Sequence, residues 1–446
     1  MVAARSAAAV VAATDDDCPP GEFRPLAGQR GGEAASVGGT PERSRAAPMR
    51  SLRPLGGQRS GEAASVGGTP ERSREAASVG GTLFAAALAL PGMLPASALA
   101  QSAPDEGVIA LRYYDYRDWQ PGAERISVQS PYLYALVPLS DSLALEGSLV
   151  YDSVSGASPL FHDTLSGASG HGIGDYREAG DARLTKYLHD GSIAVGAAYS
   201  HEQDYISRAA SVEWRRWTVD RNRTYAIGFG AARDRINAVE GVNGPVLDRP
   251  RETYDYLLGV TQVLRADAVV ESTITWSDGR GYYADPYKLL DARPDHRRIF
   301  TWLTRLNVYV PRPDATAKLA YRYLADSFGD DSHMLEASWL QALPAGFTLT
   351  PTVRYLTQSA ARFYHDPPFP EGRVPGEPFT ADARLSAFGA FTLGLRIAKA
   401  LPHGITVDFA ANFYRQRGDW RLGGHGSPGL AEFSARWIEF GLAKRF

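Results

Sequence analysis

Charged residues recur at every second position of several otherwise apolar stretches, and they are the residues in this chain best suited to chemistry. Arg, Lys, Asp and Glu that share one face of a strand could orient a polar solute and set an ion preference if they lined a water-filled passage. Alternatively, they could pair with one another across that passage and fill it. The candidates are Arg183, Glu213, Arg215, Asp255, Glu271, Lys318, Arg322, Glu336, Arg354, Arg384, Arg396, Asp408 and Glu439.

Catalytic chemistry has less support. Ser200, His201 and Glu202 are the residue types of a hydrolase. However, neighbours in a strand point to opposite faces, so Ser200 and His201 cannot form a dyad with each other. The sequence contains no G-x-S-x-G motif, no P-loop and no dinucleotide-binding fingerprint. We expect a protein that is not an enzyme and that needs no cofactor.

Histidines in the predicted loops offer a third kind of site. Imidazole together with nearby carboxylates would suit copper or zinc, but the sequence has no HxxxH or HExxH spacing. Alternatively, these histidines are solvated polar side chains of the loops. The sequence does not decide between metal binding and solvation. The histidines are His162, His171, His201, His296, His333, His365 and His425.

The elements that must position these side chains are amphipathic strands. Ile405, Val407 and Phe409 alternate with polar or small residues, and similar alternation occurs from Tyr225 and from Phe347. A charged side chain that faces lipid at the midplane costs about 2–4 kcal/mol, so apolar faces should meet lipid and polar faces the lumen. A soluble β-sandwich would show the same alternation with its apolar face inward.

The connections between strands alternate between short and long. Sixteen stretches have strand composition, and seven short links of turn-forming residues join them in pairs, for example at 189–192 and 401–404. Longer polar links lie between the pairs, at 153–178, 234–252, 277–295, 360–381 and 416–429. The sequence therefore predicts an all-β fold, a transmembrane antiparallel β-barrel of about 16 strands, with turns on one rim and loops on the other.

The final stretch, residues 430–446, also alternates and ends on an aromatic residue. It resembles the closing strand of bacterial outer-membrane β-barrels, in which the last aromatic residue is read by the assembly machinery. Phe440, Leu442 and Phe446 would form that barrel-assembly signal, whereas Lys444 departs from the pattern. The resemblance implies an outer-membrane barrel whose partners include membrane lipid and the barrel-assembly machinery.

The first hundred residues are of a different kind. Residues 1–81 are a repetitive, low-complexity leader with almost no apolar residues to form a core, so we expect disorder, or an upstream sequence translated from a start codon placed too early. Residues 82–100 have the short apolar run of a secretory signal peptide, with Ala98 and Ala100 marking cleavage. The barrel would then comprise residues 101–446. The single cysteine, Cys18, lies in the leader, so no disulfide is expected.

Composition agrees with this division. Aromatic residues make up 11% of the chain, as expected where aromatic girdles meet two interfaces. The mean hydropathy is −0.25, and no run approaches the roughly 20 apolar residues of a spanning helix. The net charge of −3 at pH 7 gives no reason to expect a nucleic-acid partner.

The stretch 182–236 carries a more specific resemblance. Lys186 and Tyr187 precede a tight turn, the segment 200–207 reads SHEQDYIS, and Arg233 to Ile236 reads RDRI. These elements resemble the bacterial family catalogued as domain of unknown function 3570, thought to be outer-membrane barrels. The resemblance covers about residues 105–446. It implies architecture and location, but no substrate.

We therefore expect a protein of the Gram-negative outer membrane, present there after signal-peptide cleavage. Its expected role is a porin-like pore or facilitator for a small polar or charged solute. The alternatives are a plugged barrel that docks a periplasmic or surface partner, or metal handling by the loops.

Overall fold

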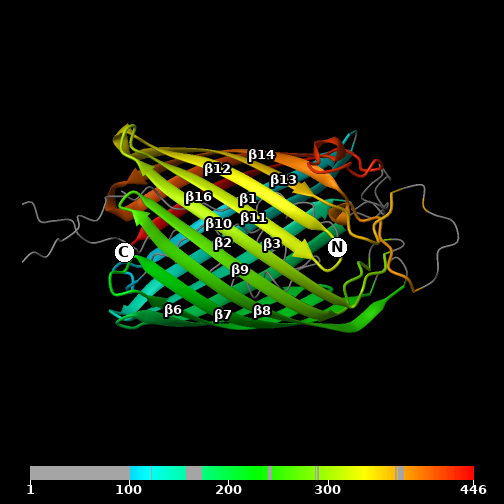
Figure 1. Cartoon of the computed structure of the whole chain (residues 1–446), viewed down its shortest axis with the longest axis horizontal. Coiled ribbons are helices and arrows are strands. Elements are labelled where there is room, and N and C mark those ends of the chain that lie inside the picture. Colours follow the sequence, from blue (N-terminus) through cyan, green and yellow to red (C-terminus); the bar gives the residue numbers. More distant parts are fainter. Residues whose placement is uncertain are drawn as a thin grey trace, which may run out of the picture.

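Sixteen antiparallel strands close into a barrel (Figure 1). The computed structural model describes residues 101–121, 123–156, 173–239, 244–286, 288, 291–366, 369 and 376–446. Each strand pairs with its neighbours in the sequence, and β1 pairs with β16 to complete the ring. The predicted fold class, a transmembrane antiparallel barrel of about 16 strands, is confirmed. The predicted leader (1–81) and signal peptide (82–100) lie outside the described residues.

The strands are long enough to cross a bilayer at a tilt, since about 9–11 residues suffice. Their bounds are β1 (Val108–Gln120), β2 (Ala123–Ser140), β3 (Leu143–Gly156), β4 (Ile173–Tyr187), β5 (Gly191–Glu202), β6 (Tyr205–Trp217), β7 (Arg223–Ala238), β8 (Val246–Arg265), β9 (Ala268–Gly281), β10 (His296–Val310), β11 (Ala315–Asp326), β12 (Asp331–Leu343), β13 (Phe347–Gln358), β14 (Phe388–Leu401), β15 (Ile405–Arg417) and β16 (Phe433–Arg445). No helix in the described part is long and apolar enough to cross a membrane.

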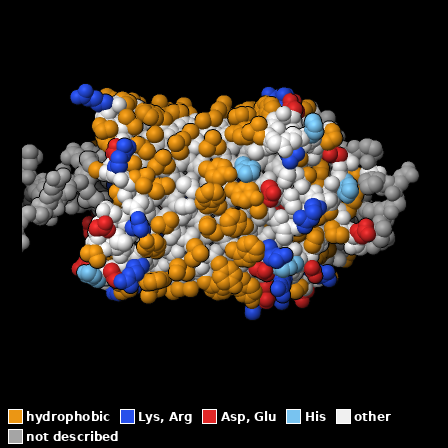
Figure 2. Space-filling view, viewed as in Figure 1, with side chains coloured by type: hydrophobic (Ala, Val, Ile, Leu, Met, Phe, Trp, Pro, Cys, Tyr) orange, Lys and Arg blue, Asp and Glu red, His pale blue; other side chains and the backbone are white. Residues whose placement is uncertain are grey.

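The outer surface is apolar. Ile227, Leu258 and Phe409 are 52%, 58% and 45% exposed, although they lie in the middle of regular strands. A sandwich would bury such residues between its sheets, whereas here the apolar side of each strand faces outward. Hydrophobic side chains form a wide band on the face in view, with charged side chains at both ends (Figure 2). This surface fits a barrel that spans a lipid bilayer.

The two rims differ as predicted, but some of the long links have other bounds: the β3–β4 and β7–β8 links are shorter than expected, and the β13–β14 link is longer. All seven predicted short links form turns on one rim, which we call the turn side; the opposite rim is the loop side. Strand β3 continues to Gly156 and β4 begins at Ile173, so both ends of 153–178 are strand, and 157–172 lie outside the described residues. Likewise, β7 and β8 extend through most of 234–252. Polar residues at these strand ends had suggested loops, although polar residues also suit strands that extend beyond the apolar band.

The last strand closes the barrel beside the first. Strands β16 and β1 pair in register from Arg445 opposite Val108 to Ser434 opposite Trp119. Beyond the strand, the Phe446 amide donates to the Gly107 carbonyl (3.0 Å), and the Gly107 amide donates to the Phe446 carbonyl (2.8 Å). A Cβ on Gly107 would lie 2.5 Å from the Phe446 ring, so glycine lets the terminal ring lie over this backbone.

Candidate functional site

Four charged side chains form a connected group on the inner wall, on strands β1, β14, β15 and β16. Arg112 lies 3.1 Å from Asp408 and 3.8 Å from Glu439. Arg396 lies 3.1 Å from Glu439 and 3.9 Å from Asp408. Gly441 makes room for the group, because a Cβ there would lie 2.2 Å from Asp408 Oδ2. The two cations and two anions alternate, so each charge has an opposite neighbour.

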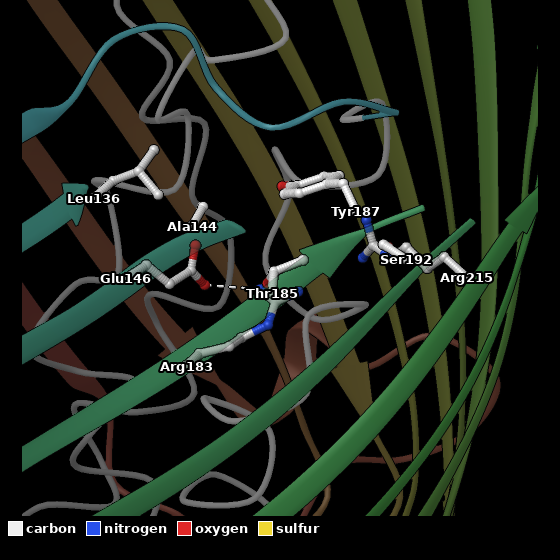
Figure 3. Close-up of a pocket in the computed structure, with 8 residues that line it drawn as sticks. All are labelled: Leu136, Ala144, Glu146, Arg183, Thr185, Tyr187, Ser192 and Arg215. Atoms are coloured by element: carbon white, nitrogen blue, oxygen red, sulfur yellow. Dashed lines mark hydrogen bonds and ion pairs between the residues drawn. The ribbon is translucent and has the colours of Figure 1, made fainter. Parts of the chain in front are cut away.

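A second group lies on strands β3, β4 and β6. Arg183 Nη1 donates to Glu146 Oε1 at 2.7 Å, and Arg183 also lies 4.0 Å from Glu213. Arg215 Nε donates to the same Glu213 carboxylate at 2.6 Å. Tyr187 lies beside this group. The residues around it line a small cavity of about 20 Å³, enough for one water molecule, between Leu136, Ala144, Glu146, Arg183, Thr185, Tyr187, Ser192 and Arg215 (Figure 3).

These ion pairs run along the wall and not across the lumen. On the described strands, these inward ion pairs lie within one strand, as for Arg215 and Glu213, or join strands that are adjacent or next but one. Arg354 and Glu336 are a typical pair, 2.8 Å apart on neighbouring strands β13 and β12. Pairing across the lumen was one of the two arrangements considered from the sequence, and the pairs described above are of the lateral kind.

Twelve of the thirteen charged candidates lie on strands, on the side away from the exposed apolar residues. Arg384 is the exception, and its placement on a strand face was wrong. It lies in a short 3-10 turn, η5 (Ala383–Leu385), before β14 begins. The Asp382 carboxylate accepts a hydrogen bond from the Arg384 amide, and the Gln358 side chain donates to the Arg384 and Ser386 carbonyls. These side chains bind the backbone groups that a strand ladder would otherwise bind.

Three loops pack together on the loop side, and we call this assembly the loop cover. The β9–β10 loop contributes Tyr283, the β11–β12 loop contributes Phe328, and the β13–β14 loop contributes Phe363, Tyr364 and Leu385 to one buried cluster. Tyr283 and Phe328 meet edge to face at 6.0 Å, and Phe328 meets Phe363 in the same way at 5.1 Å. These loop aromatic residues therefore pack against one another in a buried cluster and do not extend from the barrel.

Buried charges join the same loops. Arg293 of the β9–β10 loop lies 2.9 Å from Asp291 and 2.8 Å from Asp382 of the β13–β14 loop. Arg384 lies 2.9 Å from Asp285 and also binds Asp382. The side chains of Arg293 and Asp382 are wholly buried. Removal of one partner would leave an uncompensated buried charge, so these pairs fix how the two loops fit together.

Lys288 lies inside this group of charges and is 3% exposed. Burial lowers its pKa from the ordinary 10.5 to about 7, although the carboxylates of Asp285 and Asp382 act to raise it. The cations of Arg384 and Arg125 also lower it. The ammonium therefore loses its proton near neutral pH, which changes the net charge of the loop cover.

The turn side is crossed by the segment before β1. Gly107 pairs with Phe446 at the β1–β16 seam. Six residues earlier, Gln101 Nε2 donates to the Arg221 carbonyl (3.0 Å) and to Thr224 Oγ1 (3.1 Å), at the turn between β6 and β7. Seven extended residues reach at most about 25 Å. Residues 101–107 therefore run from one part of the rim to another, with Ala103 buried along the way.

An apolar inner wall was missed by the sequence analysis. The inward side chains of β1, β2 and β12–β16 form one buried cluster near the loop side, packed against Leu430. Its members are Tyr114, Tyr116, Ile126, Val128, Met334, Leu356, Phe388, Ala390, Tyr414, Phe433, Ala435 and Trp437. The sequence of β1 carried a signal for this inner wall, because large apolar side chains lie on both of its faces. Tyr114 and Tyr116 face inward, and Leu111 and Tyr113 face outward.

The histidines that the structure describes do not cluster. His296 Nε2 lies 3.2 Å from the Asp278 carboxylate, His333 Nδ1 lies 2.8 Å from the Tyr321 hydroxyl, and His365 stacks on Phe379. His162 and His171 lie outside the described residues. Within the part of the chain that the structure describes, no group of three or more His, Cys, Asp and Glu side chains could hold a metal ion.

The closed strand order and the apolar exterior define a transmembrane β-barrel with a charged inner wall. The chain belongs to the family described as "Protein of unknown function (DUF3570)", whose model matches residues 80–250 and 245–437. The resemblance seen in the sequence is thereby confirmed. No curated protein matches the chain.

Solved structures of similar shape are distant. A bacterial polysaccharide outer membrane secretin is 10% identical with a TM-score of 0.42, and the alignment covers 76% of this chain and 98% of the secretin. OccK9 (OpdG) of Pseudomonas aeruginosa is 12% identical with a TM-score of 0.37, covering 76% and 98%. The siderophore receptor PirA of Pseudomonas aeruginosa is 11% identical with a TM-score of 0.39, covering 74% of this chain and 61% of PirA. The chain thus spans less than two thirds of the receptor.

Proposed function

We propose that this protein is an outer-membrane pore or facilitator that lets a small polar or charged solute cross the Gram-negative outer membrane without catalysing a reaction. The observation that carries the proposal is the lateral pairing of the inward charges. Arg and carboxylate side chains that pair along the wall form a polar lining, in which the Arg396 side chain stays 18% exposed and can orient a polar solute. Side chains that met across the lumen would instead fill it.

The segments at the two ends of the barrel limit the passage of solutes in this proposal. The loop cover lies over part of the loop side, and residues 101–107 cross the turn side. Both restrict passage to small solutes in this proposal. The mixed charge of the wall, with arginines and carboxylates alternating, suits a solute that carries both donors and acceptors.

Current through single molecules is the direct test. The full chain would be expressed in a Gram-negative host, extracted from membranes and inserted into a planar bilayer. The proposal expects stable, ion-selective current steps. Heat-modifiable gel migration serves as the folding control, because a closed barrel runs differently before and after boiling. A folded protein that gives no current, even with the loop cover opened by Arg293→Ala, would contradict the proposal.

The second candidate is a docking barrel for a periplasmic or surface partner. It is favoured by the same loop cover and by residues 101–107, since both reduce the opening. For a docking barrel, we expect no conductance in any variant. We also expect that a partner can be crosslinked to the turn side or the loop side of the intact protein. The two candidates therefore make opposite predictions for Arg293→Ala.

Export and assembly form part of the proposal. Signal-peptide cleavage after Ala100 would give a mature protein that begins at Gln101, which N-terminal sequencing can check. Phe440 and Leu442 are 52% and 42% exposed on the outer face of β16, and Phe446, directly after the strand, is 58% exposed. An assembly machinery could bind them there.

A further inference from the structure

Arginines form a row on the outer face of the barrel, at the loop-side ends of β6 to β9. Arg208 on β6 lies directly opposite Arg233 on β7. Arg233 lies opposite Glu252 on β8, and Glu252 lies opposite Arg280 on β9. Arg235 follows on β7. The side chains of Arg233 and Arg280 are more than three quarters exposed, so they point into the surroundings of the barrel.

The row begins where the apolar band ends. Phe229 on β7 packs against Tyr254 at 6.3 Å and against Tyr256 at 5.4 Å, and these rings are exposed on the same outer face. Trp276 lies opposite Tyr256 on the next strand. Each of these aromatic residues lies two to four positions from the row along its own strand. In Figure 2, charged side chains gather at the loop-side end of the face in view, beside the hydrophobic band.

The row of arginines contributes little to the stability of the fold. Like charges directly opposite each other on neighbouring strands are destabilising, as with Arg208 and Arg233. The ion pairs nearby are exposed and contribute little to stability: Arg233 to Glu252 at 3.2 Å and Arg235 to Asp248 at 2.8 Å. Within the described part of the chain, Arg208 itself has no ion-pair partner. An anion between Arg208 and Arg233 would relieve their repulsion.

We propose that this row binds the phosphorylated headgroup of a membrane lipid, with the acyl chains of that lipid against the aromatic residues Phe229, Tyr254 and Trp276. Adjacent strands are about 4.8 Å apart, so two guanidinium groups can bind different oxygens of one phosphate. Arginine suits this role because its planar fork matches phosphate oxygens and because it is weakly hydrated.

The position of the row favours a lipid over a free anion. The arginines face away from the lumen, so a solute in transit does not meet them. The phosphate of a lipid lies at the level where the acyl region ends, and this is the level of the row. The inference goes beyond the proposed passage of solutes and requires only that the barrel sits in a bilayer.

Lipid retention measured by native mass spectrometry tests the inference. The full chain is expressed, extracted from membranes, and mixed with phosphatidic acid or with diacylglycerol of the same acyl chains, so that the two probes differ in the phosphate. We expect retention of phosphatidic acid, and a loss of roughly 30-fold in its affinity for the double variant Arg208→Ala/Arg233→Ala. Arg216→Ala is the matched control, because Arg216 is exposed on the outer face of β6 at the turn side. It should retain the lipid as the unchanged protein does.

A second variant keeps the test decisive if the double variant fails to fold. Glu252→Gln removes the carboxylate that competes for Arg233, so it should raise the affinity for phosphatidic acid. Equal retention of the two probes, or equal affinity in all variants, would overturn the inference. Displacement of the lipid by inorganic phosphate at the same concentration would also overturn it, since the row would then bind free anions. Heat-modifiable migration and conductance of the same preparations show separately whether the barrel folds and conducts.

Discussion

Gly441 shows how tightly a single residue constrains the inner wall. A Cβ at this position would lie 2.2 Å from Asp408 Oδ2, and Asp408 binds Arg112. Gly441→Ala must push the carboxylate away, and overpacking of this kind costs about 1–3 kcal/mol. We expect a lower urea concentration at the midpoint of unfolding. The folded fraction at each urea concentration can be measured by heat-modifiable gel migration. Gly259→Ala is the control, since a Cβ there meets its nearest atom at an ordinary 3.4 Å. Equal midpoints for the two variants would contradict the packing described for Gly441.

Lys288 gives the loop cover a dependence on pH. Its folded pKa of about 7 lies below the ordinary 10.5, so the unfolded loop binds more protons between these two values. Stability of the cover therefore rises as the pH rises from about 7 towards 10.5, and the cost of the buried charge is present in full below pH 7. We expect loop amides to be better protected at pH 9 than at pH 6. Hydrogen exchange measures the protection of these amides, once the rates are corrected for the intrinsic effect of pH on exchange.

Lys288→Met is the matching variant, because it keeps the length of the side chain and removes the titrating group. Its corrected protection should be nearly independent of pH between 6 and 9. The same pH dependence in the variant as in the unchanged protein would assign the effect to other groups of the loop cover, such as Asp291 or Asp330, whose pKa values burial raises.

The sequence identified the inward charges but not their neighbours. Alternation along one strand fixes the face on which Arg183 or Glu439 lies, because the period of a strand is two. It does not fix which residue of the next strand stands opposite, since that depends on register. The pair of Arg112 with Glu439, on strands β1 and β16, follows only from the closed ring.

Among the elements, the β13–β14 loop holds the loop cover together. Arg293 joins it to the β9–β10 loop through Asp382, with both side chains buried. Arg293→Ala leaves Asp291 without its cation and removes one of the two arginines that bind Asp382. Loss of one partner of a buried pair costs about 3–5 kcal/mol. We expect the cover to open, which gives larger and more frequent current steps in a planar bilayer. Arg298→Ala, on the exposed outer face of β10, should leave the current unchanged. Unchanged current in both variants would show that the cover does not restrict passage.

Strand number and pairing order were predictable from the sequence, whereas this loop was not. Sixteen amphipathic stretches and seven short turns suffice for an antiparallel ring, because each hairpin dictates its own pairing. Arg384 was misplaced because the alternation around it continues beyond the strand. Gln358 and Asp382 bind the backbone there through contacts that periodicity does not reveal.

At the scale of the whole molecule, the charges of the inner wall set ion preference. Arg322 lies on the inward side of β11, as does Lys318. Arg322→Glu changes the local charge by two units, which in water is roughly 1 kcal/mol for an ion about 8 Å away, or about fivefold in permeability ratio. We expect the reversal potential in a salt gradient to shift towards cations. Leu319→Gln, on the outer face of the same strand, serves as the control. An identical shift in both variants would show that ions do not pass along this wall.

The apolar exterior and the closed ring make the barrel, but passage of a solute depends on the lumen. Single-channel current through the membrane-extracted protein in a planar bilayer tests this central claim most directly. We expect stable, ion-selective steps that grow in Arg293→Ala. A silent bilayer for both proteins, with heat-modifiable migration proving that each barrel is folded, would contradict the pore and leave the docking barrel.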